Sequence, residues 1–488
     1  MKNYYYFLLS FITLFLFSIN GHAKAQDKLI NLSSCDLLSS HQIKKLSAVR
    51  IEHQQLQNGL KVYILENHQL PVFSLQLVFD VGAGDELPGE SGYAHLFEHM
   101  MFKGSTHVPD GDHFSAIKHT GGNVNAATDY DKTAYWTEAP ANSLDMVLWL
   151  EAERLQNLAI TESNLDNQRQ AVLEEKLLRI DNVPYFKIAS EFMISAWQGT
   201  DYNHLVIGNE TSINNATVKK VKRFFDQYYQ PDNAILVLAG DIDPAMALKK
   251  IKFYFSAIKN KSITAPEAKA ENKVNILRGK SESHYDPLAP FPLYALGWHT
   301  AGMKNSDFYA VELLADILLN HDASRFKQRL KDEYELVFEI IGFPLTFEQA
   351  GITAMGMVPH SYADFDQIKT VVKNELKQVH LHGVSNMELC SAKKYRQMKI
   401  IKKMANNRQM AEMIADGVLF FNDPLYAITA LNAYQNVDNQ QIKAVAQQYF
   451  HDDWLALEIE PGPGVRFVKW IMEVLPQGLS KSLEQLFF

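Results

Sequence analysis

The stretch SGYAHLFEHMMFKGS, residues 91–105, places one carboxylate between two imidazoles within five residues. In a helix, His95 and His99 stand at positions i and i+4, which are neighbours on one face. Glu98 comes one residue before the second histidine and therefore flanks the pair. An ordinary amphipathic helix does not require this grouping, so the question is what these three side chains hold.

We expect this helix to begin after Ser91, whose hydroxyl is a good N-cap, and to end at Gly104. Its histidine pair suits Zn²⁺, for which neutral imidazole is a good ligand. The order H-x-x-E-H reverses the H-E-x-x-H signature of zinc peptidases. Glu98 is then placed to accept a proton from the water that such a metal activates.

A catalytic zinc site needs a third protein ligand and one open position. Candidates nearby are His107, His113 and His119, and farther along the chain stand Glu174 and Glu175. Spacing alone does not choose among them. Adjacent helical residues point about 100° apart, so only one of the two glutamates can face the metal.

The composition and the N-terminus define the broad class of protein. The chain has 488 residues and a net charge of -9, with acidic and basic residues mixed, which argues against a nucleic-acid binder. Lys2, the apolar run 7–19 and the sequence A-K-A at residues 23–25 form the pattern of a secretory signal peptide. We therefore predict an exported protein, in the periplasm of a Gram-negative bacterium, with a signal peptide over residues 1–25.

The chain contains two cysteines, Cys35 and Cys390. They lie far apart in the sequence, and two cysteines do not make a disulfide framework. We therefore expect two unpaired thiols.

The order of predicted elements recurs after residue 273, which indicates two similar halves of about 200 residues each. Strands are expected over residues 58–67, 72–84, 121–140 and 233–243, and again over 293–302, 338–359 and 454–461. Helices are expected over residues 143–158, 162–180 and 216–229, and again over 306–319, 365–383 and 385–407. Strands grouped with helices, without strict βα alternation, predict an α+β fold in which largely antiparallel sheets pack with helices.

These patterns predict four segments after the signal peptide. An N-terminal zinc-binding catalytic domain spans residues 48–258, and a polar linker spans 259–273. A C-terminal pseudo-repeat domain without metal ligands spans residues 274–462, and a tail spans 463–488. Charges interrupt the apolar residues of the tail, so we expect no stable membrane insertion.

The sequence resembles the inverzincin metallopeptidases of the pitrilysin and insulysin type, and among them the half-length subunits similar to mitochondrial processing peptidase and its bacterial relatives. The resemblance rests on H-x-x-E-H at residues 95–99 and on QRQAVLEEKLLRIDNVPY at residues 168–185. In that family an arginine precedes the ligand glutamate by six positions, so Arg169 selects Glu175 over Glu174. The resemblance implies a mitochondrial-processing-peptidase-like metallohydrolase fold.

The same resemblance implies the roles of the site residues. One Zn²⁺ per chain is held by His95, His99 and Glu175, with Glu98 as the catalytic base. Relatives often carry a supporting glutamate seven residues before the ligand, where this chain has Gln168. The charge of that outer contact is lost, although an amide can still hydrogen-bond.

A second motif, G-G-x-x-N-A-x-T, begins at Gly121 and Gly122. Relatives use it as an edge strand that pairs with an extended substrate. The resemblance therefore implies that Asn125, Ala126 and Thr128 bind substrate. Pairing of this kind mainly contacts the backbone of a peptide, which favours broad specificity.

The second half departs from the family at two positions. Relatives carry an arginine and a tyrosine that grip the substrate, where this chain has Lys331 and Phe338. Phenylalanine cannot donate a hydrogen bond. The resemblance thus implies a heterodimer in which a similar subunit supplies the arginine–tyrosine grip, or alternatively a homodimer in which Lys331 is a weaker cation.

The function expected from the sequence is that of an exported zinc-dependent endopeptidase or oligopeptidase, the metal-bearing subunit of a two-chain enzyme. Its substrates would be peptides or unfolded proteins. The alternatives are a non-catalytic, peptidase-like assembly subunit and a peptide-binding subunit. The first would be expected to have lost a ligand or the base, whereas the resemblance supplies all four groups here.

Overall fold

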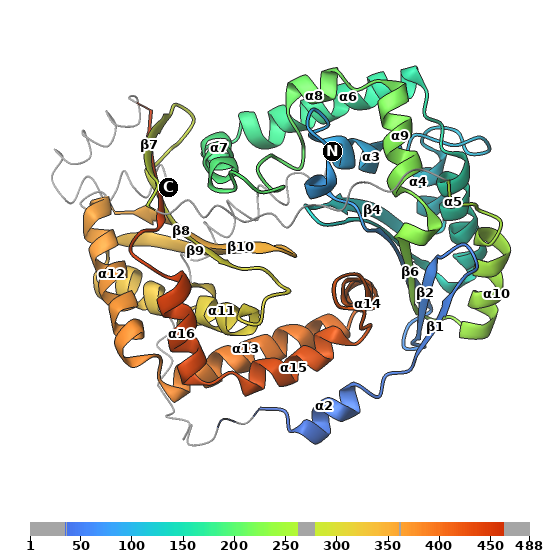
Figure 1. Ribbon diagram of the computed structural model, residues 1–488. Coiled ribbons are helices and arrows are strands. Elements are labelled where there is room, and N and C mark those ends of the chain that lie inside the picture. The colour runs from blue at the N-terminus through green and yellow to red at the C-terminus, as the bar shows by residue number, and fades with distance from the viewer. Residues whose placement is uncertain (1–34, 36, 262–278, 361–362, 463–488) are drawn as a thin grey trace. The chain divides into compact units, whose positions relative to one another are not determined.

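The computed structural model describes residues 35, 37–261, 279–360 and 363–462. The predicted signal peptide, most of the predicted linker and the predicted tail lie outside the described residues, so these predictions stay untested. Two sheets, each packed with helices, make up the described part (Figure 1). This arrangement confirms the predicted α+β fold.

The first sheet has six strands, and β4 forms one of its edges. Its order is β1-β2-β6-β3-β5-β4, and all neighbours are antiparallel except β2 and β6. The central strand β6 is buried along its whole length, whereas β4, at the edge, alternates exposed and buried residues. The strands are β1 (Ile51–Gln55), β2 (Lys61–Glu66), β3 (Val72–Phe79), β4 (Asn123–Thr128), β5 (Thr133–Pro140) and β6 (Ala234–Gly240).

Helices fill the connections of the first half. The predicted helix over residues 162–180 ends its regular part at Lys176 and continues as a π-helical turn, Leu177–Asp181. The helices are α2 (Ser40–Leu46), α3 (Tyr93–Met100), α4 (Asp112–His119), α5 (Leu144–Asn157), α6 (Glu162–Lys176), α7 (Phe186–Ala196), α8 (Glu210–Asn214), α9 (Val218–Tyr228) and α10 (Pro244–Phe255).

The second sheet repeats the strand order of the first. Its order is β7-β11-β8-β10-β9, which matches β2-β6-β3-β5-β4 position by position. The parallel pair also recurs, because β7 and β11 are parallel as β2 and β6 are. The strands are β7 (Ser281–Asp286), β8 (Leu293–Ala301), β9 (Val337–Thr346), β10 (Ala350–Pro359) and β11 (Leu455–Pro461). The predicted internal repeat is confirmed.

The helices of the second half are α11 (Phe308–Ala315), α12 (Phe365–His382), α13 (Asn386–Met404), α14 (Asn407–Phe421), α15 (Tyr426–Asn436) and α16 (Asn439–Tyr449). The sequence pattern predicted the first three of these helices and not the last three. None of the described helices is both long and apolar enough to cross a membrane.

Each half also covers a face of the other half's sheet. Helix α14 packs Ala411 and Ile414 against the face of the first sheet that carries Val78 and Val237. Conversely, α7 belongs to the first half and packs Phe192 among buried residues of β10 and β11. Because a fully buried aliphatic or aromatic side chain contributes roughly 1.5–3 kcal/mol, these two shared clusters stabilise the contact between the halves, beside the core that each half has of its own.

Both cysteines are disulfide-bonded, and none is free. The expectation of two unpaired thiols is therefore wrong. Separation along the sequence, on which it rested, does not limit how close two residues lie after folding. A disulfide agrees with an oxidising compartment, where such bonds persist.

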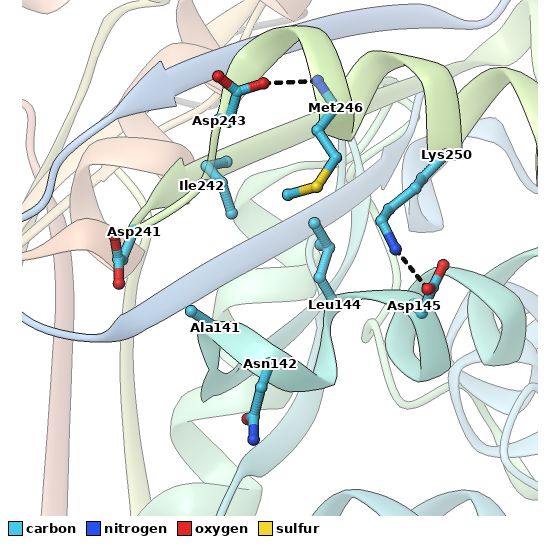
Figure 2. Close-up of a pocket in the computed structure, with 9 residues that line it drawn as sticks. All are labelled: Ala141, Asn142, Leu144, Asp145, Asp241, Ile242, Asp243, Met246 and Lys250. Carbon is cyan, nitrogen blue, oxygen red and sulfur yellow. Dashed lines mark hydrogen bonds and ion pairs between the residues drawn. The ribbon is translucent and has the colours of Figure 1, made fainter.

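A cavity of about 350 Å³ opens where α5 and α10 begin (Figure 2). Its charged side chains have partners within the protein. Lys250 pairs with Asp145, Asp243 caps α10 through the backbone N–H of Met246, and Asp241 pairs with His68. None of the predicted site residues lines it. The lining residues are Ala141, Asn142, Leu144, Asp145, Asp241, Ile242, Asp243, Met246 and Lys250.

Candidate active site

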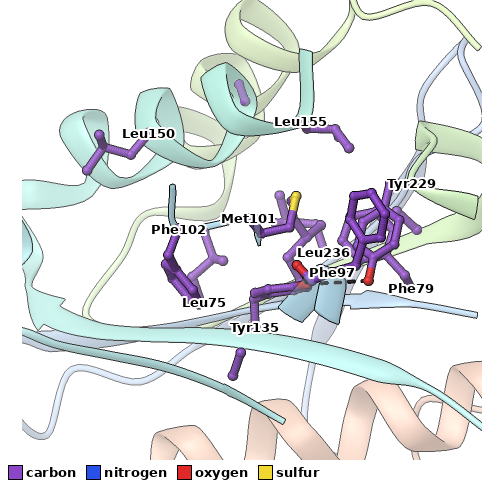
Figure 3. Packing of buried hydrophobic residues seen from close by; sticks show 14 of the residues in the cluster. Leu75, Phe79, Phe97, Met101, Phe102, Tyr135, Leu150, Leu155, Tyr229 and Leu236 are labelled. Atoms are coloured by element: carbon purple, nitrogen blue, oxygen red, sulfur yellow. Dashed lines mark hydrogen bonds between the residues drawn. The ribbon is translucent and has the colours of Figure 1, made fainter. Parts of the chain in front are cut away.

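Helix α3 carries the H-x-x-E-H motif and is fixed by its apolar face. Phe97 stacks against Phe224 and Phe225 of α9, with ring centroids 5.5 and 5.8 Å apart. Its ring also packs on Tyr229 in the same cluster (Figure 3). Residues Leu96 and Met100 are fully buried on the same side. The helix therefore turns its histidines and Glu98 away from this core.

The start of α3 differs from the expectation. The N-cap is Gly92 and not Ser91, and the cap comes from a carboxylate earlier in the chain. Glu86 accepts hydrogen bonds of 2.8 Å from the backbone N–H groups of Gly92 and Ala94, and His204 Nε2 lies 2.9 Å from it. Local cap patterns could not reveal Glu86, because it lies before the helix and contacts the helix start across a loop.

A glycine is required at position 92 for two reasons, which are its backbone conformation and the close approach of another segment of the chain. Its φ of 94° lies in the left-handed region that favours glycine. A Cβ at this position would stand 2.7 Å from Gly208 Cα and 2.8 Å from the carbonyl oxygen of Ile207. This close approach sets the start of the helix one turn before His95.

The structure brings His95, His99 and Glu175 together. Glu175, in the last turn of α6, places Oε2 3.1 Å from His99 Nε2 and 3.8 Å from His95 Nε2. Ligands about 2.1 Å from a tetrahedral Zn²⁺ stand roughly 3.4 Å apart, which is close to both distances from Glu175. Within the described part of the chain, this is the one group of three or more potential metal-binding side chains.

The charge states of the group also fit a metal. Burial lowers the pKa of His95 to about 4, and the neighbouring His99 acts in the same direction, so His95 is neutral at pH 7. Burial raises the pKa of Glu175, but its hydrogen bond with His99 and nearby positive charge outweigh burial and lower it overall. Two imidazoles and one ionised carboxylate are a donor set that zinc accepts.

Glu98 lies next to this group, half-buried on α3. The hydroxyl of Thr128, the last residue of β4, donates a hydrogen bond of 2.7 Å to Glu98 Oε2. Burial raises the pKa of Glu98, and the Thr128 hydrogen bond opposes that shift. A carboxylate with a raised pKa is a better proton acceptor near neutral pH.

The other potential ligands lie elsewhere. His107, His113 and His119 each contact groups outside the cluster. Glu174 is exposed, whereas the neighbouring Glu175 is half-buried and faces the histidines. The geometry therefore separates the two glutamates, as the helix period requires.

Gln168 and Arg179 both lie near Glu175 in the sequence, but only Arg179 contacts its carboxylate. Gln168 is buried on the same helix, and its amide donates to Asn167 Oδ1 at 2.5 Å. Arg179 Nη1 lies 2.5 Å from Glu175 Oε1, the carboxylate oxygen that faces away from the histidines. Sequence reasoning missed Arg179, although glutamate and arginine at i and i+4 are a recognisable helical pair.

Strand β4 forms one edge of the first sheet among the described strands, beside the group. It pairs with β5 on one side and is the last strand of the sheet. Along it Asn125 is exposed and Ala126 is buried, as alternation requires. Thr128 contacts Glu98, a role that the sequence did not predict.

In the second half, Lys331 and Phe338 stand where relatives carry the arginine and tyrosine that grip the substrate, and the structure shows the contacts of both. Lys331 Nζ lies 2.6 Å from Glu339 Oε2, so its charge is already paired. Phe338, on β9, is 52% exposed and packs its ring on His360.

Two sheets of matching order and one His–His–Glu group define the class of duplicated, metallopeptidase-like α+β proteins. Two family models match the chain in turn. Residues 61–202 match "Insulinase (Peptidase family M16)", and residues 215–395 match "Peptidase M16 inactive domain". The chain belongs to peptidase family M16. Its H-x-x-E-H motif and Glu175 fall in the first match.

Known proteins of the family support this assignment. The zinc protease PqqE of Helicobacter pylori is 28% identical over 441 residues, which cover 87% of this chain and 96% of that protein. The crystal structure of a protease from Helicobacter pylori superimposes with a TM-score of 0.79 at 24% identity, covering 84% and 99% of the two chains. The periplasmic protease PqqL of Escherichia coli superimposes with a TM-score of 0.70 at 19% identity, covering 90% of this chain and 50% of that one.

Proposed function

We propose that the protein is an exported zinc-dependent endopeptidase or oligopeptidase. The observation that carries the proposal is the convergence of His95, His99 and Glu175, with ligand atoms within 4.8 Å of one another, beside the carboxylate of Glu98. Relatives named zinc proteases agree with this assignment.

His95, His99 and Glu175 would hold one Zn²⁺ per chain. The chemistry supplied by zinc in such a site is activation of water at neutral pH and polarisation of a carbonyl. Glu98 accepts the proton of the attacking water and then delivers it to the leaving amine. Arg179 holds the second oxygen of Glu175, a supporting role that the sequence assigned to Gln168.

The substrate is a peptide or an unfolded segment that adds to the free edge of β4. Backbone groups near Asn125 and Ala126 pair with it, and this places the peptide near Glu98 of α3, which is hydrogen-bonded to Thr128 at the end of the strand. Recognition through the backbone favours broad specificity.

The protein acts outside the cytoplasm, in the periplasm of a Gram-negative bacterium. The signal-peptide pattern of residues 1–25 supports this location, and so do the disulfide-bonded cysteines. The neighbour from Escherichia coli is itself a periplasmic protease.

The experiment that tests the function is metal analysis joined to cleavage of a quenched peptide. We expect about one zinc per chain and hydrolysis that a chelator abolishes and added zinc restores. Zinc without any turnover would favour a non-catalytic assembly subunit. Peptide affinity that survives chelation, again without turnover, would favour a peptide-binding subunit.

The chain is the metal-bearing member of a two-chain enzyme. Lys331 is neutralised by Glu339, and Phe338 has no hydroxyl, so neither supplies a free donor for the developing oxyanion. A second exported subunit of similar size, without H-x-x-E-H, supplies the arginine–tyrosine grip. A homodimer that relies on Lys331 is the alternative.

Purified alone, the chain should therefore bind zinc yet cleave peptides slowly. A missing oxyanion donor costs about 2.7–4 kcal/mol in the transition state. Turnover and molecular mass are to be measured together for the single chain and for Lys331→Ala. Full activity as a homodimer, with a large loss in Lys331→Ala, would contradict the heterodimer.

A further inference from the structure

Thr128 is held in place by its neighbours on both sides. It forms the last pair of the β4–β5 ladder, opposite Thr133, which is fully buried. The next two residues are anchored to another loop, because the backbone N–H groups of Ala83 and Gly84 donate to the carbonyls of Asp129 and Tyr130. The backbone of Thr128 is thus fixed before and after the residue.

A fixed threonine is a suitable group to aim a carboxylate. Its branched Cβ restricts the side chain to few rotamers, so the hydroxyl direction follows from the backbone. Glu98 by contrast has three rotatable bonds on a helix surface and needs an outside contact to select one orientation. The hydrogen bond of 2.7 Å to Oε2 supplies that contact.

The contact also distinguishes the two oxygens of Glu98. Oε2 accepts the hydroxyl of Thr128, so Oε1 has more free acceptor sites for a proton from water. A hydrogen bond to an ionised carboxylate is stronger than one between neutral groups. A small misorientation of a catalytic group lowers the reaction rate strongly, so a hydrogen bond that fixes the orientation affects the rate.

We propose that Thr128 is a positioning residue for the base Glu98, so that the strand expected to pair with the substrate also aligns the group that activates water. The inference rests on the proposed function. It departs from the role in substrate binding that the family motif implied for Thr128. One rigid strand then sets both the peptide register and the direction of proton transfer.

The test compares Thr128→Val, which removes the hydroxyl at nearly constant shape, with Thr128→Ser, which keeps it. Single-turnover cleavage of a quenched peptide by excess zinc-loaded protein gives the maximal rate and the half-saturating concentration. We expect Thr128→Val to lose about 10- to 100-fold in maximal rate, with half-saturation and zinc affinity unchanged. Thr128→Ser should recover most of the rate.

A matched control is Thr137→Val on the neighbouring strand β5. Among the described residues the hydroxyl of Thr137 is buried without a partner, so its removal should leave the rate unchanged. In a Glu98→Gln background, Thr128→Val should add little further loss, because both variants act on one unit. Thr128→Ala, which leaves space, repeats the test if Thr128→Val unfolds.

The inference is overturned by an undiminished rate in Thr128→Val, by a change confined to half-saturation, or by full additivity with Glu98→Gln. A wild-type chain that does not cleave peptides, or a fully active Glu98→Gln variant, instead overturns the proposed function and the inference with it. Normal zinc-dependent cleavage that needs Glu98 but not Thr128 removes the inference alone.

Discussion

Glu98→Gln is expected to retain zinc and to lose a factor of roughly 10² to 10⁴ in the rate of peptide hydrolysis, the usual contribution of general acid–base catalysis. The amide has nearly the shape of the carboxylate, and its oxygen can still accept the hydroxyl of Thr128. It cannot take a proton from water. The loss should therefore appear in the chemical step and not in folding.

The measurement is single-turnover cleavage of a quenched peptide, with zinc content determined on the same samples. Glu174→Gln is the matched control, since it makes the same chemical change at an exposed neighbour of the site. Cleavage by Glu98→Gln within about threefold of the wild type would exclude Glu98 as the base, because general bases contribute far more.

Glu175→Gln should weaken zinc binding by more than the roughly 10- to 100-fold that follows loss of an outer contact. Glu175 Oε2 is the oxygen that approaches both His99 and His95, and an amide oxygen carries no charge with which to hold a cation. Glu174 is exposed and should tolerate the same change without loss of zinc.

Zinc affinity is to be measured by competition with a chromophoric chelator, together with the thermal unfolding midpoint of each variant. Equal affinity in both variants, or loss only in Glu174→Gln, would show that the glutamate assignment is wrong. A folded Glu175→Gln protein with wild-type affinity would also remove Glu175 from the ligand set.

The fold could be predicted because its pattern is spread along the chain. Strand and helix periods recur in both halves, and the recurrence is reproduced in the strand order of the two sheets. The exchange of α7 and α14 between halves could not be predicted, because apolar periodicity shows that a helix face is buried but not against what.

The candidate site, like the fold, could be predicted from the sequence only in part. The i, i+4 spacing placed His95 and His99 on one face of α3, whereas Glu175 required the resemblance to a family. Glu86 escaped prediction because no local cap motif encodes its contact with the start of α3. The Ser91 prediction failed for the same reason, because the carboxylate of Glu86, six residues before Gly92, caps the start of the helix instead. Arg179 stands at i+4 from Glu175, a spacing that could have revealed the pair.

The crossed packing of α7 and α14 has a consequence for folding. A first sheet that forms before α14 docks leaves Val78 and Val237 bare. Such an apolar surface is open to aggregation and to chaperones until it is covered. Each half has a core cluster of its own, but the faces buried by α14 and α7 are covered only when both halves are present. A chain that lacks α14 would keep this apolar face of the first sheet exposed.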